Sequence, residues 1–78
     1  MVEHDATHAL IAKALGLVTS AISEESTFGS PENWDSLGHM RILLEIEASI
    51  GHELDAEVAA EIMDVKSARL VLLNHRPD

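Results

Sequence analysis

Apolar residues recur along the chain at helical spacings of three and four, and no useful stretch alternates with the period of two that marks a half-buried strand. The first helical segment begins after Asp5 or Thr7, either of which can cap a helix, and Gly16 marks its end. Its expected buried stripe is Leu10, Ile11, Ala14 and Leu15. The pattern therefore predicts one amphipathic helix at the start of the chain.

From Leu17 to Asp35 the helical pattern gives way to hydroxyl residues, glycine, proline and asparagine, which predicts a long loop. Loops of this length are uncommon in compact domains, and they are usually functional or held down by apolar side chains. The expected anchors of this loop are Val18, Ile22 and Phe28.

The second predicted helix, which Asp35 or Ser36 can cap and Gly51 would end, carries two apolar faces. On a helical wheel, a continuous arc wide enough to face the core is formed by His39, Ile42, Leu43, Ile46 and Ile50. A second arc, beside Ser36, is formed by Leu37, Met40 and Leu44. Because a surface helix normally needs one apolar stripe, the second arc indicates a surface for partners. A plainer interpretation stays open, in which these three residues cover the loop or the short third helix.

Two further helices complete the predicted fold. Asp55 can cap a short third helix, and Asp64 can cap a fourth that ends before Pro77. The third would hold Val58, Ala59, Ile62 and Met63. The fourth would turn inward Val65, Ala68 and Leu72, with Leu73 as a further candidate. The prediction is an all-α bundle of three main helices and one short helix, in a single domain spanning residues 1–78.

Composition narrows the possible functions. The chain has 78 residues with 14 Asp+Glu against 5 Lys+Arg, a net charge of -9 and no cysteine. A core of this size leaves little room for a deep catalytic cleft, so we expect no enzyme. The acidic excess argues against nucleic acid and anionic membranes as partners, and the absence of cysteine excludes disulfides and thiolate chemistry. The first residues lack the pattern of a signal peptide, so we expect a cytoplasmic protein. We also expect it to be a monomer.

One motif connects the second helix to a known family. Residues 34–40, Trp-Asp-Ser-Leu-Gly-His-Met, resemble the phosphopantetheine attachment site of acyl and peptidyl carrier proteins, whose shared core is Asp-Ser-Leu at the start of the second helix. The resemblance covers nearly the whole chain. Its length, its helix order, Phe28 within the long loop and the acidic segment 53–64 are all similar to this family.

The resemblance implies that a separate phosphopantetheinyl transferase attaches 4′-phosphopantetheine from coenzyme A to Ser36. The thiol of this arm would carry an acyl or aminoacyl group as a thioester, which supplies the thiol that the chain lacks. Asp35 and Leu37 would belong to the motif that the transferase reads, although by chemistry alone Asp35 can equally be a helix cap. A serine in the first helical turn also holds a phosphodiester near unpaired backbone N–H groups and the positive end of the helix dipole.

Enzymes that reach this arm would dock on Leu37, Met40, Arg41, Leu44 and Glu47. The helix is less acidic than is usual in carriers of dissociated fatty acid synthesis, because its acids after Asp35 are Glu45 and Glu47. Arg41 should also reject basic docking sites by like-charge repulsion. We therefore expect a specialised lipid, polyketide, nonribosomal peptide or aminoacyl-transfer pathway, with acyl- or aminoacyl-activating and transferring enzymes as partners.

Other polar residues suggest weaker hypotheses. Ser36 and His39 are three apart and could meet on a helix, but no oxyanion hole is apparent in the sequence, so hydrolysis is disfavoured. His4 and His8 could share a metal ion; without a third ligand, a solvated pair near a frayed N-terminus is the better interpretation, and we expect no metal site. A different class of function also stays open: an acidic helical adaptor without a prosthetic group, which binds a basic amphipathic partner through Leu37, Met40 and Leu44.

Overall fold

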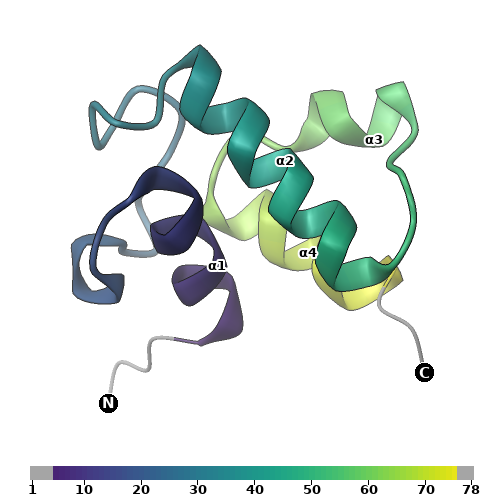
Figure 1. The fold of residues 1–78 in the computed structure, drawn as a ribbon, viewed down its shortest axis with the longest axis horizontal. Coiled ribbons are helices and arrows are strands. Elements are labelled where there is room, and N and C mark those ends of the chain that lie inside the picture. The colour runs from purple at the N-terminus through teal and green to yellow at the C-terminus, as the bar shows by residue number, and fades with distance from the viewer. Residues whose placement is uncertain (1–4, 76–78) are drawn as a thin grey trace.

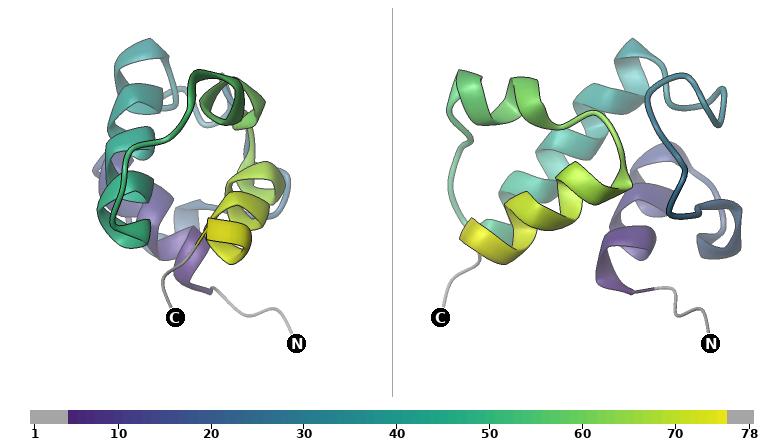
Figure 2. Two further views of the ribbon diagram at one scale, coloured as in Figure 1. Left: turned by 90° about the vertical axis from the view of Figure 1, so that its right-hand side faces the viewer. Right: turned by 180° about the vertical axis from the view of Figure 1, so that it is seen from behind.

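A computed structural model describes residues 5–75, and within this range the chain forms four α-helices, one short 3-10 helix and no strand. The elements are α1 (Ala6–Leu15), η1 (Thr19–Ala21), α2 (Ser36–Ile50), α3 (Ala56–Glu61) and α4 (Val65–His75). The all-α prediction is confirmed. Figures 1 and 2 show α2 and α4 running beside each other, with α1 against both and α3 in the connection between them. Within the described range, no helix is long and apolar enough to cross a membrane.

The ends of α1 and α2 follow their local sequence signals. Asp5, and not Thr7, caps α1, and its carboxylate accepts hydrogen bonds from the backbone N–H groups of Thr7 at 3.0 Å and His8 at 3.2 Å. Asp35 caps α2 in the same way. Both helices end at glycines in the left-handed conformation, Gly16 with φ 73° and Gly51 with φ 83°, which a residue with a side chain rarely adopts.

The core gathers apolar side chains from three helices and from the long loop. Trp34, directly before α2, is fully buried and is the largest of them. The predicted inner face of α2 is confirmed for Ile42, Ile46 and Ile50, while His39 and Leu43 lie half-buried at its edge. The other buried apolar residues are Ile11, Ala12, Ala14, Leu15, Ile22, Ile62, Val65, Ala68 and Val71, with Leu10 half-buried beside them.

The anchors predicted for the long loop are right for Ile22 and wrong for Val18 and Phe28. Val18 is 70% exposed and Phe28 is 49% exposed. The loop is held by its backbone instead, because Phe28 N–H donates to the Met63 carbonyl at 2.8 Å and Val65 N–H donates to the Ser26 carbonyl at 3.1 Å. These bonds attach the loop to the connection between α3 and α4, so its exposed side chains need not enter the core.

The last two helices differ from prediction at their apolar positions. α3 ends at Glu61, so Ile62 and Met63 follow it, and Ile62 is buried whereas Met63 is exposed. Asp64 caps the start of α4 as predicted, since its carboxylate accepts from the Ser67 N–H at 2.8 Å. Leu73 is exposed, contrary to expectation, because it lies about 80° around the helix from Val65, on the side away from Ala68 and Val71.

Candidate functional site

Ser36 is the first residue of α2 and is exposed to solvent. The carboxylate of Asp35 accepts a hydrogen bond from the Gly38 N–H at 2.8 Å, so the predicted capping role is confirmed. At a helix start, the N–H groups of the first turn have no acceptor within the helix, and the aligned peptide dipoles add partial positive charge. An anionic group attached to the Ser36 hydroxyl would therefore be stabilised at this position.

Trp34 fixes the chain two residues before Ser36. Its side chain is fully buried. Its backbone N–H donates to the Pro31 carbonyl at 2.9 Å, and its backbone carbonyl accepts from the Gly29 N–H at 2.8 Å. The indole Nε1 also donates to Nδ1 of His39 at 3.0 Å. Ser36 thus lies two residues after a residue that is hydrogen-bonded through both its backbone and its side chain.

His39 lies half-buried between two aromatic rings. Its ring is stacked with Trp34, with centroids 6.3 Å apart, and meets Phe28 edge-on at 5.5 Å. Burial lowers the pKa of His39 below its usual 6.5. Because Nδ1 accepts the indole hydrogen, the geometry assigns the ring proton of neutral His39 to Nε2. Nδ1 is therefore occupied by Trp34 and is not available as a base toward Ser36.

Gly38 allows the first turn of α2 to approach its neighbours closely. A methyl group at this position would overlap the backbone carbonyl oxygen of Asn33 and Cδ2 of Leu15. The sequence pattern does not reveal this role, although a glycine inside a helix is a signal of close packing. The loop, α1 and the start of α2 are consequently in direct contact behind Ser36.

The second apolar arc of α2 is a free surface. We call Leu37, Met40 and Leu44 the apolar face; these side chains are 58%, 60% and 59% exposed. The interpretation in which they cover the loop or α3 is therefore wrong. The exposed apolar surface also includes Phe28, which touches His39, and Met63, whose carbonyl is bonded to Phe28. Sequence reasoning missed Met63 by assigning it to α3.

The charged residues near the apolar face differ in their surroundings. Arg41 is exposed, and no carboxylate of the described residues forms an ion pair with it. Glu47 is half-buried and accepts a hydrogen bond from the Leu54 N–H at 2.9 Å, which fixes the connection between α2 and α3. Glu47 thus has an internal partner that its sequence position does not suggest, and its predicted contact with partner enzymes stays a prediction.

A polar network around the buried His8 lies at the start of α1. His8 is buried, not solvated as expected, and its Nε2 lies 2.7 Å from Oε2 of Glu24; His4 is outside the described residues. Arg69 donates to Glu24 at 2.7 Å and to Asp5 at 2.8 Å. The hydrogen bonds from Arg69, with a smaller contribution from His8, lower the pKa of Glu24 to about 2. This network joins α1, the loop and α4. Residues 5–75 contain no group of three side chains able to hold a metal ion.

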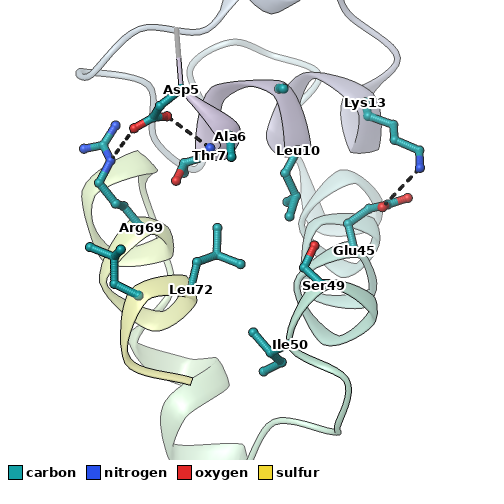
Figure 3. Close-up of a pocket in the computed structure, with 12 residues that line it drawn as sticks. Asp5, Ala6, Thr7, Leu10, Lys13, Glu45, Ser49, Ile50, Arg69 and Leu72 are labelled. Carbon is teal, nitrogen blue, oxygen red and sulfur yellow. Dashed lines mark hydrogen bonds and ion pairs between the residues drawn. The ribbon is translucent and has the colours of Figure 1, made fainter. Parts of the chain in front are cut away.

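A cavity of about 570 Å³ lies between α1, α2 and α4 (Figure 3). Leu10, Ile50 and Leu72 contribute to its apolar lining, and two ion pairs, Asp5–Arg69 and Lys13–Glu45, lie at its sides. Its residues on α2 belong to the second half of that helix, and Ser49 is about 20 Å along the helix axis from Ser36. The cavity is therefore separate from the site at the start of α2.

The residues predicted for the site lie together on α2. Asp35 caps the helix, Ser36 and Leu37 are in its first turn, and Met40, Arg41 and Leu44 follow over the next two turns. An exposed hydroxyl beside an exposed apolar face can present a covalently attached group to a large partner. No family model matches the chain.

Proposed function

We propose that this chain is a carrier protein, without catalytic activity of its own, whose Ser36 receives 4′-phosphopantetheine from coenzyme A. The arm would hold acyl or aminoacyl intermediates as thioesters for partner enzymes. One observation carries the proposal: Ser36 is an exposed hydroxyl on the first residue of a helix that Asp35 caps, next to the exposed apolar face. The motif at residues 34–40 supports the same assignment.

The attachment chemistry uses groups that this site provides. Oγ of Ser36 forms a new bond to the phosphorus that carries pantetheine, the pyrophosphate bond of coenzyme A breaks, and adenosine 3′,5′-bisphosphate leaves. A base of the transferase takes the hydroxyl proton. The phosphodiester product carries a negative charge, which the N–H groups and dipole of the first turn of α2 stabilise. The thiol at the end of the arm is then the one thiol on the protein, because the chain has no cysteine.

The wider proposal concerns the fold family and the partners. The order of α1, a long loop, α2, a short α3 and α4 is compatible with the carrier arrangement that the motif implies. The partners would be a phosphopantetheinyl transferase and the enzymes that activate and transfer acyl or aminoacyl groups. The exposed Arg41 on α2 favours a specialised pathway over general fatty acid synthesis. The proposal also includes that the protein works as a monomer in the cytoplasm.

The test is modification of the apo protein by coenzyme A and a transferase of broad specificity, followed by intact mass. We expect wild type to gain one phosphopantetheine and Ser36→Ala to gain none. Ser49→Ala is the matched control, since Ser49 is also an exposed serine on α2 but lies at its far end. A wild-type chain that gains no mass, or a Ser36→Ala variant that still gains it, contradicts the proposal. The first result would favour the adaptor hypothesis.

A further inference from the structure

The two glutamates of α2 are both engaged within the molecule. Oε1 of Glu45 lies 3.5 Å from Nζ of Lys13, which connects α2 to α1. Oε2 of Glu47 accepts from the Leu54 N–H at 2.9 Å, which connects α2 to the segment before α3. Both side chains are half-buried. Both glutamate carboxylates of α2 thus contact other segments of the protein.

Arg41, in contrast to these glutamates, has no ion-pair partner among the described side chains. It stands four residues before Glu45, where two side chains of a helix can meet, but the Glu45 carboxylate is paired with Lys13 of α1. An arginine placed before its glutamate also has the weaker of the two orientations for such a pair. Arg41 lies about 40° around the helix from Leu37 and about 60° from Leu44, so it borders the apolar face. The positive charge on this border has no partner among the described side chains.

We propose that the apolar face and Arg41 together form a docking surface for a partner protein that offers an apolar surface with a carboxylate opposite Arg41. This inference rests on the proposed function, because docking beside Ser36 gives the partner access to the arm. Leu37, Met40 and Leu44 supply the apolar contact at helical spacing, as in other helix-in-groove complexes. A basic groove would instead place like charges together over Arg41, which costs affinity. The charge of Arg41 is opposite in sign to the protein's net charge of -9.

Two matched peptides test this inference on the apo protein. Both are amphipathic helices with the same leucine face, flanked by glutamates in one and by lysines in the other, and binding is measured by fluorescence anisotropy at moderate salt. We expect Arg41→Glu to lower the affinity for the glutamate peptide by about tenfold and to raise the affinity for the lysine peptide. Leu44→Asp should abolish binding of both.

Lys66→Glu provides the control for net charge. Lys66 is an exposed cation on α4 without an ion pair in the described residues, so this variant changes the total charge by the same amount as Arg41→Glu. Lys66 belongs to α4 and not to the docking helix α2. Because salt screens exposed charges, we expect Lys66→Glu to change the affinity for either peptide by less than about twofold. Equal effects of Arg41→Glu and Lys66→Glu, or no binding of the glutamate peptide to wild type, would overturn the inference. The peptide experiment contains no coenzyme A, so neither of these results bears on the proposal that Ser36 receives phosphopantetheine.

Discussion

The indole Nε1 of Trp34 donates a hydrogen bond to Nδ1 of His39 across a distance of 3.0 Å. This bond joins Trp34, the residue before the Asp-Ser-Leu motif, to His39 at the end of the first turn of α2, so it spans Ser36. It requires His39 to be neutral, since protonated imidazole has no acceptor nitrogen. The start of α2 is therefore coupled to the protonation of one histidine.

The first prediction concerns stability and pH. Burial lowers the pKa of His39 in the folded state below 6.5, so the unfolded chain binds this proton more tightly. The contribution of His39 to stability is thus complete above pH 6.5 and is lost as pH falls toward the lower pKa of the folded state. Urea unfolding of wild type and His39→Gln at neutral pH and at about pH 5 measures it, and wild type should lose more stability than the variant.

His52→Gln is the control for this experiment. His52 is exposed and follows the end of α2 opposite to Trp34, and its replacement should leave the pH dependence of wild type unchanged. If His39→Gln loses as much stability between the two pH values as wild type does, His39 is not the responsible group.

A second prediction concerns Gly38. Replacement of a helical glycine by alanine normally stabilises by up to about 1 kcal/mol through helix propensity. Here the new methyl group would overlap the Asn33 carbonyl and Leu15, and forcing extra volume into a packed site costs about 1–3 kcal/mol. We expect Gly38→Ala to lower the free energy of unfolding, measured by urea titration. The exposed Ser49→Ala should change it by no more than about 0.5 kcal/mol, and a stabilised Gly38→Ala would show that the approach is not tight.

A third prediction separates the two roles of Asp35. As a helix cap, Asp35 can be replaced by asparagine with little loss, whereas alanine should cost about 0.5–2 kcal/mol of unfolding free energy. As part of the motif that the transferase reads, Asp35 should need its charge. We therefore expect Asp35→Asn to fold like wild type and to accept phosphopantetheine more slowly, measured by the rate of mass gain. An Asp35→Asn protein that is loaded at the wild-type rate would leave Asp35 with the capping role alone.

Local signals made much of the fold predictable from the sequence. The helix α1 starts after Asp5 and ends before Gly16, and α2 starts after Asp35 and ends before Gly51. These ends are predictable because capping depends on residues within one turn of the helix end. The inner face of α2 follows from the spacing of its three isoleucines. The apolar residues beside Ser36 had two open interpretations; their exposure excludes a cover over the loop or α3, and their use as a surface for partners stays a prediction.

What the sequence did not predict depends on contacts between distant residues. Phe28 is held by a backbone hydrogen bond to Met63, far along the chain, while its side chain stays exposed. His8 is buried because Glu24 provides an acceptor that no helical pattern reveals. The hydrogen bond of Glu47 to the Leu54 N–H likewise arises only when the chain turns after α2. Periodicity describes one helix at a time, so these pairings lie outside its reach.

The most direct test of the central claim is the position of the modification. After the apo protein is treated with coenzyme A and a transferase, proteolysis and tandem mass spectrometry identify the residue that carries phosphopantetheine. The proposal predicts a single modified residue, Ser36, with Ser49 and the other hydroxyl residues unchanged. A protein that stays unmodified, or one modified at another residue, would contradict the assignment of this chain as a carrier protein with its arm on Ser36.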